Sequence, residues 1–77
     1  MNWNIVDNKL EKEFNFKSQT HLAEFLLKVA KIADELDHHP DAEIYQCSKL
    51  RLKLFTHSEN AISDLDRELA NKIDLIQ

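Results

Sequence analysis

Residues 49–54 read Lys-Leu-Arg-Leu-Lys-Leu, in which charged and apolar side chains alternate without exception. Successive side chains of a β-strand point to opposite faces of the sheet, so this alternation predicts a strand with one dry and one wet face. Phe55 and His57 follow on the wet parity. The stretch therefore predicts a sheet of which one face is covered by the rest of the chain.

A helix is predicted upstream of this strand, where the period of the apolar residues changes. Apolar side chains recur every three or four residues from 22 to 36, which places them on one helical face. Ser18 is a suitable N-cap residue. Pro40 cannot continue a helix and disfavours helical geometry in the residue before it. The helix is therefore expected to end near Leu36 or Asp37.

A second helix is predicted downstream, from about Ser63. Asp66 follows Ser63 at the spacing of a capping box, in which two residues satisfy free N–H groups of the first helical turn. Residues 58–62 are expected to form the loop that precedes this helix. Its buried stripe is expected to consist of Leu65, Leu69, Ile73 and Ile76.

Shorter segments complete the predicted sheet. Residues 3–6 are apolar, and Asp7-Asn8 suits a tight turn. Residues 10–16 alternate as a half-buried strand does, although Lys12 falls on the apolar parity. A further short strand is expected at residues 44–47.

The element order strand, strand, helix, strand, strand, helix predicts one α+β domain over residues 1–77. Helices with a single apolar face must pack on a sheet. We therefore expect a two-layer sandwich, with a four-stranded antiparallel sheet and two helices on one face. Because the chain has no glycine, turns with positive φ must use Asn or Asp, such as Asn8 or Asn60.

The composition narrows the possible functions. The formal net charge of −4 argues against direct nucleic-acid binding, which normally needs a basic face. No stretch reaches the length of a membrane span, and residues 1–7 lack the pattern of a signal peptide. Cys47 is the single cysteine, which excludes an internal disulfide and favours a reducing compartment such as the cytoplasm. A core this small predicts self-association.

Three histidines are the candidates for chemistry. His38 and His39 lie between a helix end and Pro40, where an irregular backbone can aim both rings into one cleft. His57 lies just past a predicted strand end and can join them. Histidine can donate or accept a proton near neutral pH. From the residues alone, a solvated surface position remains the slightly favoured alternative for each of the three.

Two carboxylates are spaced to assist these histidines. Asp34 lies four residues before His38 and projects toward the same loop, where a carboxylate can orient an imidazole. Asp66 lies nine residues after His57, in the first turn of the last helix. There it can receive a polar ligand group or complement the helix dipole. Taken alone, Asp34 is better explained as a solvated residue and Asp66 as a cap.

Zinc binding is the main competing use of three histidines. Zinc needs ligands held in a fixed geometry, often as His-x-x-x-His, and no such pair occurs here. The rings of adjacent histidines diverge, and Cys47 has no partner at a ligand-like spacing. Cys47 also falls in an expected strand without a basic activator. The sequence predicts neither a metal site nor a covalent nucleophile.

Two stretches resemble the pterin-4a-carbinolamine dehydratase family. Residues 34–41 read Asp-Glu-Leu-Asp-His-His-Pro-Asp, which is similar to the family's acidic residue followed by His-His-Pro. Residues 49–57 are similar to its strand that ends in Thr-His, and residues 66–74 to its tail. The resemblance extends over nearly the whole chain.

The resemblance implies an activity: dehydration of a 4a-hydroxytetrahydropterin to the quinonoid dihydropterin, without a metal or a redox cofactor. It implies that His38 and His57 transfer protons and that Asp34 supports His38. It assigns the pterin contacts to His39, Pro40 and Asp66. Family members form dimers and tetramers, so a homodimer or homotetramer is expected. Some stabilise dimers of a transcription factor, so a non-enzymatic binding module, acting as a coactivator or assembly factor, is the alternative.

The chain departs from the family pattern at two places. After Thr-His the family usually has two glycines, whereas residues 58–61 here read Ser-Glu-Asn-Ala, of which Asn60 tolerates a left-handed conformation. The family's aromatic residue after His-His-Pro is replaced by Cys47, unless a bulge shifts Tyr45 into its place.

Overall fold

The computed structural model describes residues 2–77 and contains the predicted elements in the predicted order. They are β1 (Asn4–Val6), β2 (Lys9–Asn15), α1 (Gln19–Leu36), β3 (Asp41–Tyr45), β4 (Lys49–Leu54) and α2 (Asp64–Ile76). Ser18 caps α1 as predicted, since its hydroxyl accepts a hydrogen bond from the His21 N–H at 3.1 Å. No helix within residues 2–77 is both long and apolar enough to cross a membrane.

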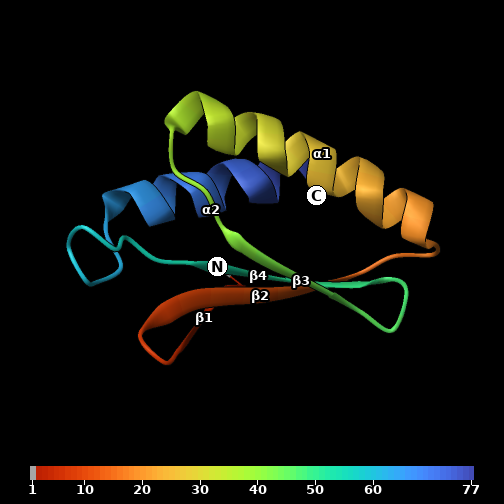
Figure 1. Cartoon of the computed structure of the whole chain (residues 1–77), viewed down its shortest axis with the longest axis horizontal. Coiled ribbons are helices and arrows are strands. Elements are labelled where there is room, and N and C mark those ends of the chain that lie inside the picture. Colours follow the sequence, from red (N-terminus) through yellow and green to blue (C-terminus); the bar gives the residue numbers. More distant parts are fainter. Residues whose placement is uncertain (1) are drawn as a thin grey trace.

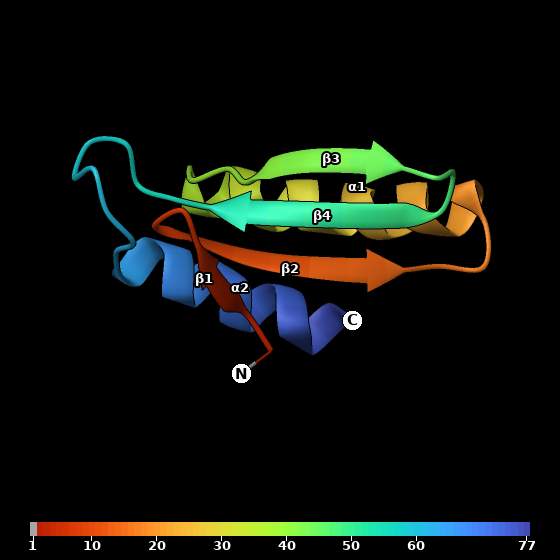
Figure 2. The ribbon, with the colours of Figure 1, turned by 90° about the horizontal axis from the view of Figure 1, so that it is seen from below.

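The strands form one antiparallel sheet in the order β1-β2-β4-β3, and both helices cover the same face of it (Figure 1). Seen from the open face, α1 runs behind β3 and β4, whereas α2 lies on the side of β1 and β2 (Figure 2). The predicted two-layer α+β sandwich is therefore confirmed. The end of α1, the start of α2 and the end of β4 lie at one end of the molecule. We call it the histidine end, because His38, His39 and His57 belong to these segments.

The core lies between the sheet and the helices. Leu50, Leu52 and Leu54 of β4 have no exposed surface, as their alternation predicts. The helices add Leu22, Phe25, Val29, Leu69 and Ile73 to the same cluster. The other parity of the strands forms an open face with cross-strand ion pairs, such as Lys53 Nζ to Glu43 Oε1 at 2.9 Å.

Lys12 lies on the buried parity of β2, where the sequence pattern had no explanation for it. Its side chain is 8% exposed, and Nζ donates to Asp74 Oδ1 at 2.9 Å and to Gln77 Oε1 at 2.8 Å. The indole N–H of Trp3 donates to the same Asp74 oxygen at 3.1 Å. The lysine is therefore tolerated because α2 brings a carboxylate to it, and this contact ties β1 and β2 to the last helix.

The expected strand at residues 44–47 is wrong in its bounds. β3 ends before Gln46, and Gln46 and Cys47 form a turn with φ of 48° and 69°. The expectation that only Asn or Asp would take positive φ is therefore wrong at this turn. The β1–β2 turn at Asp7 and Asn8 also has positive φ at both positions, 50° and 65°. Turns of this hand match the right-handed twist of paired strands, which explains why Gln46 and Cys47 adopt positive φ without the preference for it that Asp and Asn have.

Candidate active site

α1 ends in a left-handed turn that reverses the chain toward the core. Asp37 has φ of 50°; its N–H donates to the Asp34 carbonyl at 3.2 Å, and the His38 N–H donates to the Ala33 carbonyl at 3.1 Å. This pair of bonds satisfies the last free carbonyls of a helix. As a result, His38 packs into the histidine end with only 12% of its side chain exposed.

The first turn of α2 holds a buried carboxylate. Ser63 is the N-cap, and its backbone N–H donates to Asp66 Oδ2 at 2.9 Å, so the predicted capping box is confirmed. Thr56, two residues past the end of β4, donates its hydroxyl to the same oxygen at 2.7 Å. Asp66 has no exposed surface. Its carboxylate is thus fixed both by its own helix and by the end of the central strand.

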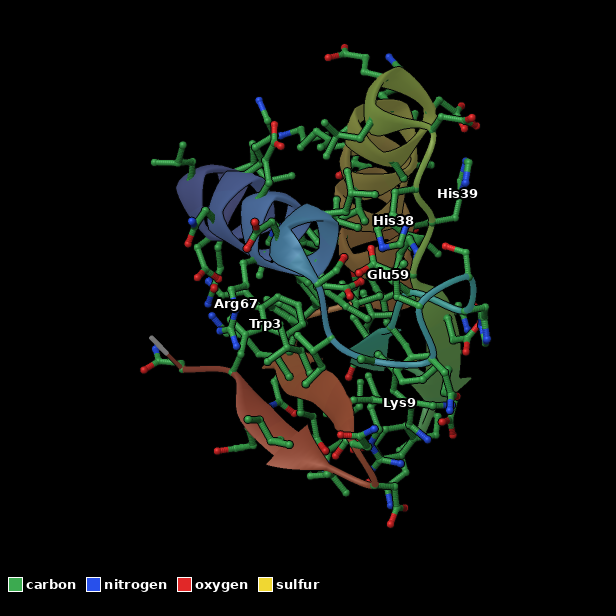
Figure 3. The ribbon with its side chains drawn as sticks, turned by 90° about the vertical axis from the view of Figure 1, so that its left-hand side faces the viewer. Trp3, Lys9, His38, His39, Glu59 and Arg67 are labelled. Carbon is green, nitrogen blue, oxygen red and sulfur yellow. The ribbon has the colours of Figure 1, made fainter. Side chains whose placement is uncertain are left out.

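His38 meets this carboxylate and connects the end of α1 to the start of α2. Its Nε2 lies 2.5 Å from Asp66 Oδ1. Figure 3 shows His38 directed inward between the two helices, whereas His39 projects to the outside. An imidazole oriented by a buried carboxylate is an arrangement suited to general acid–base catalysis.

Asp34 pairs with His39 rather than with His38. The His39 Nε2 to Asp34 Oδ1 distance is 2.7 Å, and the two side chains are 55% and 75% exposed. The expectation that Asp34 supports His38 is therefore not met in this structure. The reason is the reversal at Asp37, which turns His38 into the core and leaves its neighbour beside the last turn of α1.

His57, three residues past the end of β4, lies at the same end of the molecule. Its ring contacts Phe55 edge-on, with 5.2 Å between centroids, and the residue is exposed. Its link to His38 runs through the neighbouring Thr56 and Asp66. Pro40 is half-buried and immediately precedes β3.

The loop after His57 closes without glycine. Thr56 and Ala61 exchange backbone bonds of 3.0 and 3.4 Å, and the Asn60 N–H donates to the His57 carbonyl at 3.1 Å. Asn60 has φ of 52°, so the prediction that it takes the left-handed conformation is confirmed. Ala61, the other residue of this loop that stands where the family has glycine, is not among the residues with positive φ, so its Cβ atom causes no steric conflict there.

Burial changes the interpretation of Asp66. The family resemblance implied a pterin contact for it, yet both of its oxygens are engaged by protein groups and none of its surface is exposed. Direct contact with a ligand would require these bonds to break. In this structure Asp66 meets His38 and presents no surface of its own to a ligand.

Thr56 is a site residue that sequence reasoning did not single out. It has the same parity as Leu50, Leu52 and Leu54, and it is 4% exposed. A hydroxyl on the buried parity of a strand needs a partner from the covering helices. That mismatch between polarity and parity is the signal that identifies it.

The candidate aromatic positions lie away from the histidine end. Tyr45 is the last residue of β3, five residues from Pro40, which corresponds to about 16 Å along an extended strand. Its hydroxyl meets the Glu13 carboxylate, which raises the pKa of Tyr45 and lowers that of Glu13. Cys47 is one step further, in the turn. Neither residue therefore lies at the histidine end.

A hollow of about 340 Å³ lies at the opposite end, between the first half of α1 and the end of α2. It is lined by Asn15, Phe16, His21, Glu24, Phe25, Lys28, Ile76 and Gln77. Its single histidine, His21, is exposed and has no buried carboxylate partner among the hydrogen bonds of residues 2–77. The hollow is therefore a weaker candidate for acid–base chemistry than the histidine end, where His38 meets a buried carboxylate. Nowhere in residues 2–77 do three His, Cys, Asp or Glu side chains gather closely enough to hold a metal.

Several known proteins are similar to this chain in sequence. A protein of Sulfolobus acidocaldarius, named as a proposed pterin-4-alpha-carbinolamine dehydratase, is 47% identical over 75 residues, covering 97% of this chain and 81% of its own. A protein of Prochlorococcus marinus with the same proposed name is 40% identical, with 96% and 76% covered.

Solved structures share the fold. A transcriptional coactivator/pterin dehydratase from Brucella melitensis superposes with a TM-score of 0.89 at 32% identity, covering 97% of this chain and 81% of the other. A pterin dehydratase-like protein, identified as a RuBisCO assembly factor in the alpha-carboxysome, has a TM-score of 0.79 at 20% identity, covering 97% and 88%. At that identity the second likeness concerns the fold alone.

The family model described as Pterin 4 alpha carbinolamine dehydratase matches residues 1–76. That match spans the segments that carry His38, His39, Thr56, His57 and Asp66. The chain therefore belongs to the pterin 4 alpha carbinolamine dehydratase family.

Proposed function

We propose that this chain is a hydro-lyase that converts a 4a-hydroxytetrahydropterin to the quinonoid dihydropterin and water. The C4a–O bond breaks, the hydroxyl leaves with a proton as water, and N5 loses its proton as the C4a=N5 double bond forms. The observation that carries the proposal is the buried contact between His38 and Asp66, in a chain of this family.

The two proton transfers need two groups that can exchange a proton near neutral pH. His38 supplies one from a fixed position, and we assign the other to His57, which lies three residues past the end of β4 at the histidine end. His39 and Pro40 precede β3 beside His38 and are proposed to contact the pterin. Asp34 orients His39.

The reaction as written consumes no electron and forms no covalent enzyme adduct. We therefore propose that it proceeds without a metal or a redox cofactor, and that the protein acts in the cytoplasm. A dehydration rate that is unchanged after treatment with a chelator would support a reaction without a metal. A loss of rate that added metal restores would contradict it.

A kinetic assay with a chemically generated 4a-hydroxytetrahydropterin tests the proposal. We expect the wild-type protein to accelerate dehydration, and His38→Ala and His57→Ala each to lower the rate by about 10²–10⁴, the usual contribution of a positioned acid or base. His21→Ala is the matched control, because His21 is an exposed histidine at the other end of α1 and should leave the rate unchanged. Wild-type turnover no faster than background, or full activity in His38→Ala, would refute the assignment.

A non-enzymatic binding module is the second candidate, favoured by one observation. β3 is an edge strand, and its Ile44 is 48% exposed. An unpaired edge with an exposed apolar residue invites pairing with another chain. We propose that a second copy of this chain pairs there, giving a homodimer or homotetramer.

Light scattering across a range of protein concentrations tests this pairing. We expect a mass above that of the monomer in the wild-type protein, and a smaller mass in Ile44→Lys. Calorimetry with a reduced pterin separates the two candidate functions. Self-association without pterin binding would favour the module, whereas binding that depends on His38 would favour the enzyme.

A further inference from the structure

We propose that Asp66 and Thr56 are positioning residues that fix the tautomer of His38, so that Nδ1 is the nitrogen that exchanges a proton with the substrate. Its catalytic consequence rests on the proposed dehydratase function. The tautomer itself is a property of the free protein and can be measured without any substrate.

The first step concerns the Asp66 oxygen that faces the sheet. Oδ2 receives the Ser63 backbone N–H at 2.9 Å and the Thr56 hydroxyl at 2.7 Å. A backbone N–H can only donate, so whatever atom occupies this position must be an acceptor. The Thr56 oxygen also lies 2.6 Å from the Ser63 hydroxyl. Because the Thr56 hydrogen goes to Asp66, the Ser63 hydroxyl donates to Thr56.

The second step concerns the other oxygen, which faces His38. Asp66 Oδ1 lies 2.5 Å from His38 Nε2. An ionised carboxylate has acceptors only, so Nε2 must carry the hydrogen, and a neutral imidazole then has its lone pair on Nδ1. Within residues 2–77 no buried side-chain nitrogen or oxygen lacks a partner, and no protein group bonds to Nδ1. Nδ1 therefore belongs to the 12% of the side chain that reaches the surface.

The third step is the consequence of replacing Asp66 by asparagine. The Ser63 N–H keeps the amide oxygen at the Oδ2 position, so the amide NH₂ is turned toward His38. An NH₂ group can only donate, and Nε2 must become an acceptor. The hydrogen of the imidazole moves to Nδ1. Asp66→Asn replaces one carboxylate oxygen by an NH₂ group of nearly the same size. The substitution therefore reverses the tautomer of His38 and places a hydrogen on Nδ1, the nitrogen that we assign to proton exchange with the substrate.

Two-bond ¹H–¹⁵N correlation spectra of ¹⁵N-labelled protein, recorded where the imidazoles are neutral, report each tautomer directly. His38→Gln assigns the His38 signals. We expect the Nε2–H pattern for His38 in the wild-type protein and the Nδ1–H pattern in Asp66→Asn. Asp34→Asn is the matched control, because Asp34 meets His39 at 2.7 Å and should change the His39 signals alone.

Kinetics then connect the tautomer to the reaction. We expect Asp66→Asn to lower the dehydration rate by at least about 10², since a comparable exchange in a serine-protease triad keeps the geometry and costs roughly 10⁴ through the wrong tautomer. Thr56→Val should lower it about tenfold, and Thr56→Ser, which keeps the hydroxyl, should restore it.

Several outcomes would overturn the proposal. One is an Nδ1–H pattern for His38 in the wild-type spectrum, which decides the question even if Asp66→Asn does not fold. Another is an unchanged tautomer in a folded Asp66→Asn protein. A wild-type protein that shows the Nε2–H pattern but does not dehydrate the pterin would refute the proposed function and leave the tautomer assignment standing.

Discussion

At the scale of single residues, the informative positions are polar side chains on buried parities. Lys12, Thr56 and Asp66 are the buried polar or charged residues among 2–77, and each pairs with a group from another element. The sequence marks such positions as mismatches between polarity and pattern. It does not name the partner in the other element, because that partner is 10 to 65 residues away. For the same reason, which carboxylate meets His38 could not be predicted.

The Lys12–Asp74 contact provides a test of how burial determines the strength of an ion pair. Asp74→Ala leaves the Lys12 ammonium, which is 8% exposed, without its carboxylate, so we expect a loss of about 2 kcal/mol in the free energy of unfolding. Glu43→Ala removes a pair with the same 2.9 Å distance, but the lysine there is 32% exposed. We expect Glu43→Ala to lower the free energy of unfolding by less than about 1 kcal/mol. Urea denaturation measures both, and equal losses would contradict the argument.

At the scale of elements, periodicity predicted the two helices and the strands β2 and β4, but neither the bounds of β3 nor the β3–β4 turn. Gln and Cys have no preference for positive φ, so the residue types at 46 and 47 do not predict a left-handed turn. The twist of the paired strands imposes it. The Asn60 turn was predictable, because asparagine tolerates that conformation and the loop around it has no glycine.

Cys47→Gly should therefore stabilise the hairpin. Cysteine at φ of 69° carries the steric cost of a Cβ atom near the following carbonyl, about 1 kcal/mol, which glycine does not have. We expect an increase of ~1 kcal/mol in the free energy of unfolding, reduced somewhat by the greater freedom of glycine in the unfolded chain. Cys47→Ala is the control and should bring no gain. A destabilised glycine variant would show that the turn is not strained.

The open face of the sheet should make stability depend on acid pH. A hydrogen bond from Tyr45 lowers the pKa of Glu13, and one from Lys53 lowers the pKa of Glu43, both from an ordinary value of 4.5. A depressed pKa in the folded state contributes stability that is present above pH 4.5 and is lost as the pH falls through the lowered value. Because both carboxylates are exposed, the effect is small.

The Glu13→Gln/Glu43→Gln variant should thus lose less stability than the wild-type protein between about pH 5 and pH 3. Urea midpoints measured across that range provide the comparison. A double variant with Glu24→Gln and Glu35→Gln on α1 controls for the change in net charge. Parallel curves for the wild-type and the open-face variant would contradict a role for these two carboxylates.

At the scale of the whole molecule, the fold places the candidate active site and the hollow beside His21 at opposite ends. The end of α1, the end of β4 and the start of α2 converge around His38 and Asp66, and the hollow beside His21 lies at the far end of the same helix. His21 and His38 are 17 residues apart, which is about 26 Å along a helix. A ligand that binds at one end therefore cannot touch the other.

This separation makes a crystal structure with a stable reduced pterin the most direct test of the central claim. We predict that the pterin lies at the histidine end, in contact with the rings of His38, His39 and His57, with the Asp66 contact to His38 retained. A pterin bound in the hollow beside His21, or a histidine end left empty at saturating pterin concentration, would contradict the account.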